Sequence, residues 1–477
     1  MEQYIELIWS HKIILAHALY AIGALSAAHA VGRARTPQAA IAWCVALISM
    51  PPVAIPLYLV FGRNKFYGYV KVFRAKGFHK EHTRDEFLGE LRPHWKNVGA
   101  PSPLERLAEM RFTTGNSAEI LIDGENTFSS MLEAISRAEE YILLEFYIVR
   151  ADAIGNKLRA ALEEKARQGV RILFLYDEVG SASLPKSYIR KLESSGNVEM
   201  RPFATTKGLW NRFQLNFRNH RKIVVVDGKT AFVGGHNVGD EYLGCDGKIG
   251  YWRDTHCRLS GPVVQQVQVA FLSDWFWATG GIPSLEWKPA PARGKGTAAL
   301  ALPTGPADDL DTGVLFFAHL INQAEKRVWI ATPYFVPDPT IIDAMTLAAL
   351  RGVEIRLLIP ERSDMTLPHL AAFSYLKELE ASGVKTFRYK KGFAHQKTIL
   401  VDDSLASIGT ANFDNRSMRL NFEINILFDD AAFAGDVEKM LEEDFSNSTP
   451  ATRNDYDGAS PAFKLAVNVA RLLAPIL

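Results

Sequence analysis

The sequence predicts a mixed α/β protein made of two similar halves, preceded by an N-terminal region with two apolar segments. Three observations lead to this prediction. A short polar pattern occurs twice in one register, strand-like and helix-like segments alternate in both halves, and two long N-terminal stretches carry no charge. Strands and helices that alternate at short spacing favour a mostly parallel sheet covered by helices.

The repeated pattern is a histidine and a lysine two residues apart, an apolar run, an aspartate, and an asparagine further on. The lysine opens the apolar run, which the β-branched residues at 222–226 and the apolar alternation at 397–401 mark as strands. Residues two apart on a strand share a face, so histidine and lysine project together. The aspartate begins a turn, and returning strands at 230–233 and 405–408 bring the asparagine back beside them. The corresponding pairs are His220 and His395, Lys222 and Lys397, Asp227 and Asp402, and Asn237 and Asn412.

A duplicated set of this composition predicts a symmetric site that handles phosphate. One His-x-Lys alone is usually a solvated strand face, but two copies in register with a downstream asparagine make that interpretation improbable. A metal site is the other alternative for paired histidines. It fits poorly, because each histidine is flanked by a cation and no cysteine or carboxylate shares its strand face.

Both copies resemble the phospholipase D superfamily, whose signature is His-x-Lys, four residues, Asp, and then Gly-Ser/Gly-x-Asn. Gly235 and Thr410 stand where that family often has serine. The resemblance covers the chain from about Ala118 to Asp430. It implies two pseudo-twofold-related phospholipase D-like domains with mixed, mostly parallel sheets, whose motifs face each other across one active site. It also implies that the chemistry needs no metal or other cofactor.

The resemblance further implies a mechanism. One histidine attacks phosphorus and becomes a phosphohistidine, while the other protonates the leaving alkoxide. The lysines and asparagines hold the nonbridging oxygens, and the motif aspartates brace the loops. Each histidine needs a carboxylate to orient it, and the candidates are Asp254 and Glu423. The sequence leaves open which carboxylate serves which histidine, and Asp254 could instead form a salt bridge with Arg253 or Arg258.

The two apolar N-terminal segments are Ile13 to Val31 and Ala39 to Phe61. Each is long enough to cross the ~30 Å hydrocarbon layer as a helix, so we expect a two-helix transmembrane anchor. Three prolines predict a kinked or re-entrant second segment. A signal peptide is the alternative for the first segment, although its acidic start argues against one. Cations after the second segment predict cytoplasmic catalytic domains, and they are Arg63, Lys65, Lys71, Arg74, Lys76 and Lys80.

Two further segments are compatible with lipid contact. Residues 186–222 combine many cations with Trp210, Phe213 and Phe217 just before the first motif. This composition suits an anionic lipid, although nucleic acid or a solvated basic face would also fit it. The tail from Ala462 to Leu477 is apolar with two cations, and predicts either an interfacial helix or a packed terminal helix.

The predicted domain order has five parts. Residues 1–62 form the transmembrane hairpin, 63–110 a juxtamembrane segment, 111–285 the first phospholipase D-like domain, 286–312 a linker rich in proline and glycine, and 313–477 the second such domain with its terminal helix.

The anchor, both motifs and residues 251–254 together resemble bacterial cardiolipin synthases of the phospholipase D type. This resemblance implies an inner-membrane enzyme that transfers a phosphatidyl group from one phosphatidylglycerol to a second and releases glycerol. Its partners would be the substrate and anionic membrane lipids, without nucleic acid, and a homo-oligomer is compatible with the sequence. The alternatives are a hydrolytic phospholipase D, another phosphatidyltransferase, a nuclease of the superfamily or an inactive scaffold. We expect His220 to be the nucleophile, because the basic aromatic segment leads into it.

Overall fold

The computed structural model describes residues 2–70, 87, 89–97, 99–207, 211, 213–247, 249–290, 292 and 296–477, and describes residues 2–10 by their backbone only. The chain divides into two compact units. The first comprises Met1–Lys71 with Thr205–Phe217, and the second comprises Val72–Ala204 with Arg218–Leu477. Lys71, Arg74, Lys76, Lys80 and Trp210, to which the sequence assigns roles near the membrane, lie outside the described residues.

The first unit contains three apolar helices, α1 (Glu2–Arg33), α2 (Pro37–Ser49) and α3 (Pro51–Phe61). The side chain of Thr36 accepts a hydrogen bond from the third residue of α2 and so caps that helix. Of the described residues, only His11–Arg33 form a helix long and apolar enough to cross a membrane. The second predicted span is divided at Met50, because two successive prolines lack the N–H groups that would continue the helix. The structure therefore does not support a multi-pass anchor, whereas the predicted proline kink is present.

Residues 205–217 belong to this first unit. The hydroxyl of Thr205 donates to the carbonyl of Gln214 over 2.9 Å. Phe217 is 1% exposed and stacks on Phe66 with ring centroids 5.5 Å apart. Phe217 is therefore part of a small aromatic core. The lipid contact that the sequence suggested for this segment does not involve the buried ring of Phe217.

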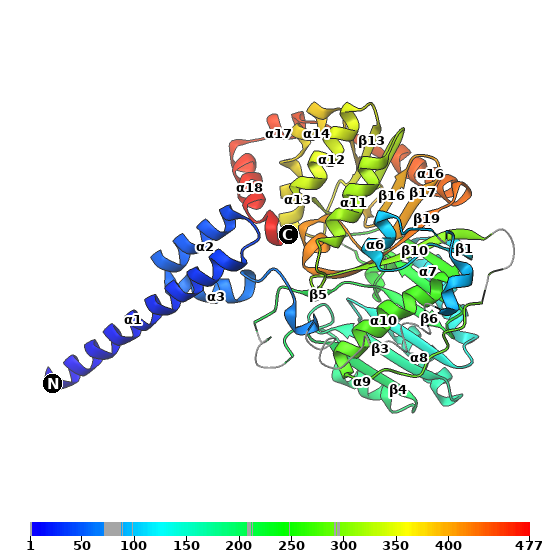
Figure 1. The fold of residues 1–477 in the computed structure, drawn as a ribbon, viewed down its shortest axis with the longest axis horizontal. Coiled ribbons are helices and arrows are strands. Elements are labelled where there is room, and N and C mark those ends of the chain that lie inside the picture. The colour runs from blue at the N-terminus through cyan, green and yellow to red at the C-terminus, as the bar shows by residue number, and fades with distance from the viewer. Residues whose placement is uncertain are drawn as a thin grey trace. The chain divides into compact units, whose positions relative to one another are not determined.

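In the second unit, most strands join one 16-stranded mixed sheet, and Figure 1 shows helices packed around it. The strand order of one half is nearly the mirror image of that of the other. The strands of one half run β4-β3-β2-β6-β7-β9-β1, and the other half follows as β10-β19-β17-β16-β11-β13-β14, with β20 at its end. The sixteenth strand, β5 (Arg218–Asn219), pairs with β19 beside this path. Antiparallel pairing of β1 with β10 joins the halves. The strands are β1 (Thr113–Ile122), β2 (Tyr141–Phe146), β3 (Arg171–Asp177), β4 (Val198–Phe203), β6 (Ile223–Val226), β7 (Thr230–Gly234), β9 (Thr255–Ser260), β10 (Thr297–Thr304), β11 (Arg327–Ala331), β13 (Glu354–Pro360), β14 (Lys385–Tyr389), β16 (Thr398–Val401), β17 (Leu405–Gly409), β19 (Asn421–Asp429) and β20 (Ser448–Ala451).

This order confirms the predicted α/β class and its two related halves. The parallel ladders join β2, β3 and β4 in one half and β11, β13 and β14 in the other, where helices connect successive strands. The strands that carry the two motifs are antiparallel hairpins next to these ladders. One boundary differs from expectation, because β10 lies inside the predicted linker 286–312 and is a buried strand at the centre of the sheet. The other domain boundaries stay predictions.

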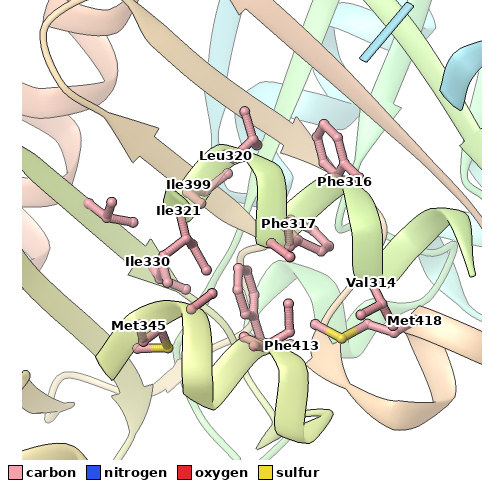
Figure 2. Packing of buried hydrophobic residues seen from close by; sticks show 14 of the residues in the cluster. Val314, Phe316, Phe317, Leu320, Ile321, Ile330, Met345, Ile399, Phe413 and Met418 are labelled. Carbon is pink, nitrogen blue, oxygen red and sulfur yellow. The ribbon is translucent and has the colours of Figure 1, made fainter. Parts of the chain in front are cut away.

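The helices of the second unit supply much of its hydrophobic core. Figure 2 shows part of this core. Phe317 of α11 packs against Phe413 with ring centroids 4.4 Å apart, and Met345 of α12 belongs to the same cluster. The helices are α6 (Pro103–Ala108), α7 (Asp123–Ser136), α8 (Ala153–Arg167), α9 (Lys186–Glu193), α10 (Val263–Thr279), α11 (Thr312–Gln323), α12 (Pro339–Leu350), α13 (Thr366–Phe373), α14 (Leu376–Ser382), α15 (Asn415–Arg419), α16 (Ala431–Ser446), α17 (Asn454–Asp457) and α18 (Pro461–Leu472), with single 3₁₀ turns η1 (Arg92–His94), η2 (Asp240–Leu243) and η3 (Ala474–Ile476).

Candidate functional site

Two very short strand pairs bring the repeated motifs together. β5 (Arg218–Asn219) precedes the first histidine and pairs with the start of β19, while β15 (Phe393–Ala394) precedes the second and pairs with β8 (Trp252–Arg253). The backbone N–H of His220 donates to Phe422 at 2.9 Å, and that of His395 donates to Arg253 at 2.7 Å. Each histidine is therefore fixed by the half to which it does not belong.

The carboxylates follow the same crosswise rule. Nδ1 of His220 lies 2.9 Å from both carboxylate oxygens of Glu423. Nδ1 of His395 lies 2.7 Å from Asp254. Both carboxylates are fully buried. The structure thus brings together the two candidate acids and the two histidines, and pairs each acid with the histidine of the other half.

The alternative interpretation of Asp254 as the salt-bridge partner of a nearby arginine does not hold. Arg253 forms its ion pair with Asp444 at 2.8 Å, and Arg258 lies 3.9 Å from Glu119. Asp254 instead accepts hydrogen bonds from the N–H of Thr255 at 2.8 Å and from the indole of Trp252 at 3.4 Å, in addition to its contact with His395.

Lys222 and Lys397 lie beside their own histidines, as the strand pattern predicts. Nζ of Lys222 donates to the carbonyl of His220 at 2.6 Å, and Nζ of Lys397 donates to the carbonyl of His395. Both ammonium groups are buried, and burial lowers the pKa of Lys222 to about 7 and that of Lys397 to about 8. At neutral pH each lysine can therefore lose its proton easily. A bound anion would stabilise the charged ammonium form, so the site favours an anionic ligand.

Burial and the nearby lysines also act on the imidazoles. Burial, with the charges of both lysines, lowers the pKa of His220 to about 4 and that of His395 to about 3. Each lysine acts on the histidine of the other motif as well as on its own, which places both motifs in one electrostatic environment. Burial alone would raise the pKa of Glu423, but His220 and Lys222 hold that pKa below its usual value. Both imidazoles are therefore neutral in the free site at neutral pH, and the carboxylates are charged.

The position that distinguishes the two copies, Gly235 or Thr410, lies against the orienting acids. The hydroxyl of Thr410 donates to Glu423 at 2.6 Å. A Cβ at Gly235 would lie 2.5 Å from Cγ and 2.6 Å from Oδ2 of Asp254. The glycine therefore makes room for the aspartate, whereas the threonine supplies a hydrogen bond to the glutamate.

Asp227 and Asp402 face away from the histidines and hold the backbone. Asp227 accepts from the N–H groups of residues 139, 140 and 141 at 2.8–2.9 Å, and Asp402 accepts from those of residues 325, 326 and 327. Both aspartates have positive φ, 52° and 51°, at the start of a hairpin turn. These contacts fit the bracing role that was expected of them.

Asn237 and Asn412 each lie three residues after the second strand of their hairpin and are nearly fully buried. The side-chain amide of Asn237 donates to the hydroxyl of Tyr242 at 2.7 Å and accepts from the N–H of Ile148 at 3.1 Å. That of Asn412 donates to Asp414 at 3.1 Å. Each amide NH₂ has a second proton that these bonds do not use.

Sequence reasoning gave no role to four residues of the site. The ring of Tyr147 lies 5.1 Å from that of His220 and under Nζ of Lys222, and the indole of Trp252 lies 4.9 Å from the ring of His395. Buried Arg221 forms an ion pair with Asp274. Gln396, at the matching place in the second copy, donates to Asp444 at 2.8 Å. Arg221 and Gln396 are the middle residues of the two His-x-Lys motifs. Their long polar side chains were the sequence signal for these contacts, which brace the loops that carry the histidines. Among the described residues, no group of three or more metal-binding side chains occurs.

Comparison with known proteins identifies the family of the chain. The family model "Cardiolipin synthase, PLD-like domain" matches residues 131–275 and 317–445, one segment in each half. Cardiolipin synthase A of Pseudomonas aeruginosa strain LESB58 is 44% identical and covers 97% of this chain and 96% of its own. Its counterpart in Pseudomonas fluorescens strain SBW25 is 44% identical over 96% of this chain. The crystal structure of phosphatidylserine synthase from Haemophilus influenzae shares the fold, with a TM-score of 0.55 and 16% identity, over 76% of this chain and 95% of that one. The chain therefore belongs to the cardiolipin synthase family with phospholipase D-like domains, a family of phosphatidyltransferase enzymes.

Proposed function

We propose that this protein transfers a phosphatidyl group from one phosphatidylglycerol to the glycerol hydroxyl of a second, forming cardiolipin and glycerol. The observation that carries the proposal is the crosswise pairing of two histidines with two buried carboxylates. A carboxylate that accepts from Nδ1 fixes the tautomer in which Nε2 carries the lone pair. Two such imidazoles suit a reaction with two successive displacements at phosphorus. The names of the relatives supply the product, cardiolipin.

In the first step, Nε2 of His220 attacks phosphorus, the P–N bond forms and the bond to the leaving glycerol oxygen breaks. His395 gives its proton to that oxygen. His395 acquires the proton when the anionic headgroup enters, because a nearby negative charge favours the imidazolium. Asp254 stabilises the imidazolium and keeps the ring in place.

In the second step, the hydroxyl of the incoming phosphatidylglycerol attacks the phosphohistidine. His395 takes the hydroxyl proton, the new P–O bond forms and the bond to His220 breaks. Lys222, Lys397 and the second protons of the two asparagines stabilise the nonbridging oxygens, on which charge grows in both steps.

Measured products test the proposal. Purified protein with labelled phosphatidylglycerol should form cardiolipin and glycerol in equal amounts. Phosphatidic acid with glycerol would instead indicate a hydrolytic phospholipase D, and cleavage of DNA or RNA would indicate a nuclease, which we do not expect. A quench in alkaline detergent, in which a P–N bond survives, should trap label from the phosphatidyl group on the wild-type protein and none on a His220→Ala variant. Label on that variant would contradict the assignment of the nucleophile.

We further propose that α1 holds the protein in the inner membrane, with the catalytic unit in the cytoplasm. Helix α1 contains the candidate span and ends at Arg33, and it is followed by Arg35, with Arg63 and Lys65 after α3. Cations gather on the cytoplasmic side of a span. Protease added to sealed spheroplasts should leave the catalytic unit intact, and cleavage of that unit would contradict the orientation.

A further inference from the structure

The C-terminal helix α18 presents two different apolar faces. Val467 and Ala470 are fully buried against the catalytic unit. Leu465, Val469 and Leu472 are 65%, 50% and 79% exposed. Their spacing of four and three residues places them in one stripe along the helix. The helix is therefore a packed terminal helix and also has an apolar face that the protein leaves in water.

The end of α18 is tied to the part of the structure that carries the second motif. The amide of Asn415 donates to the carbonyls of Ala474 and Val336 at 3.0 and 2.9 Å. The backbone N–H of Arg416 donates to Leu477 at 3.0 Å. Asn415 begins α15, three residues after Asn412 of the site.

The packing partner of α18 lies at the same edge of the sheet. The ring of Phe463 meets that of Phe373 in α13 at 5.2 Å. Helix α13 follows the carboxyl end of β13, and His395 lies beyond the carboxyl end of β11, since Ala331 pairs with Thr398. The apolar stripe and the histidine are therefore at the same edge, where the parallel strands end.

The charge of the segment identifies its partner. Residues 461–477 contain Lys464 and Arg471 and no acidic residue. Lys464 reaches the carbonyl of Asp457, and the guanidinium of Arg471 lies over the ring of Tyr375. A helix with one apolar stripe and only positive charge has the composition of elements that lie in the headgroup region of an anionic bilayer.

We propose that α18 is an interfacial helix that inserts Leu465, Val469 and Leu472 into an anionic bilayer and so holds the catalytic edge of the sheet against the lipid. The choice of a lipid partner rests on the proposed function. The insertion itself is measured without turnover, so failure of one proposal can be told from failure of the other.

A fluorescent label measures the insertion in the full chain. Leu472→Cys, in a background where exposed Cys245 is replaced by serine, carries an environment-sensitive dye. Leu350→Cys is the matched control, because Leu350 is 72% exposed but ends α12 at the opposite edge of the sheet. In vesicles of phosphatidylglycerol we expect a blue shift and quenching by brominated acyl chains at position 472 and neither effect at 350. Equal emission at both positions overturns the proposal. A blue shift without acyl-chain quenching also overturns it, since a second copy or another part of the chain would then cover the stripe.

Turnover provides a second measurement. A variant with Leu465, Val469 and Leu472 all replaced by serine keeps the buried face of α18. Its cardiolipin synthesis on phosphatidylglycerol vesicles should fall about tenfold or more, because three apolar side chains no longer leave water. Its activity on phosphatidylglycerol dispersed in detergent micelles should stay near that of the wild type. Equal activity on vesicles contradicts the insertion, whereas a wild-type protein that makes no cardiolipin in either system contradicts the proposed function instead.

Discussion

Substitution of Gly235 by alanine is the most direct test of how the orienting acids work. The added Cβ would lie 2.5 Å from Cγ of Asp254, and normal contact between carbon atoms is about 3.5 Å. The carboxylate must therefore move by about 1 Å. Asp254 is fully buried and its contact with Nδ1 of His395 is 2.7 Å long, so a movement of this size breaks the alignment. A misplacement of ~1 Å at a reacting group costs about 100-fold in rate, or about 2.7 kcal/mol.

The assay compares kcat for cardiolipin synthesis in the Gly235→Ala variant with that of the wild type and of a control. Gly435→Ala is that control, since it makes the same change inside α16, where a Cβ meets no atom within 4 Å. We expect the control to keep full activity and to gain up to about 1 kcal/mol of stability. Thermal unfolding of both variants shows whether a loss of activity is caused by unfolding of the protein. If folded Gly235→Ala turns over within about twofold of the wild type, Asp254 does not orient His395 for catalysis.

Three other predictions use the same assays. Thr410→Val removes the hydroxyl that donates to Glu423 and should lower kcat about tenfold, for the loss of a bond to a charged group, while Thr410→Ser keeps activity. Asp227→Ala removes the acceptor of three backbone N–H groups, so it should lower the free energy of unfolding by about 3 kcal/mol or more but leave the phosphoenzyme yield per folded molecule unchanged. The pH profile of kcat/KM reports groups of the free enzyme. Neutral imidazole is lost as pH falls through the lowered pKa of His220, about 4, and charged ammonium is lost as pH rises through that of Lys222, about 7, so activity should fall on both sides of that range. A profile that is flat from pH 6 to pH 9 would contradict the role of Lys222.

The sequence predicts the motif hairpins well because each is local. Two strands, a turn with an aspartate at positive φ and a returning asparagine lie within one short segment, so their spacing determines their geometry. The pairing of His220 with Glu423 could not be predicted in this way. It depends on two-residue ladders such as that of Arg218 with Asn421, which join segments far apart in the chain and carry no periodicity.

Two other differences also have physical causes. The prolines and glycines around residues 286–312 read as a linker, but the apolar residues of β10 among them are buried between the two halves. Hydropathy alone reads the second N-terminal segment as one span, since every residue in it is uncharged. Because Pro51 and Pro52 lack N–H groups, α2 ends at Ser49 and a separate helix, α3, begins at Pro51. Neither α2 nor α3 is long enough to cross a membrane by itself.

The crosswise pairing explains why the two copies differ where they do. Each half supplies a histidine and lysine to one side of the site and a carboxylate to the other, so neither histidine is paired with a carboxylate of its own half. Gly235 and Thr410 each follow a motif glycine and lie against the carboxylate of their own half, Asp254 or Glu423. That carboxylate in turn contacts the histidine of the other half. Asp254, the shorter acid, occupies the space that Gly235 leaves open, while the longer Glu423 is held by the hydroxyl of Thr410. Glycine with aspartate and threonine with glutamate are therefore coupled choices, and they make the environments of His220 and His395 unequal within a symmetric fold. Such a difference suits the proposed mechanism, in which one histidine is the nucleophile and the other is the acid and base.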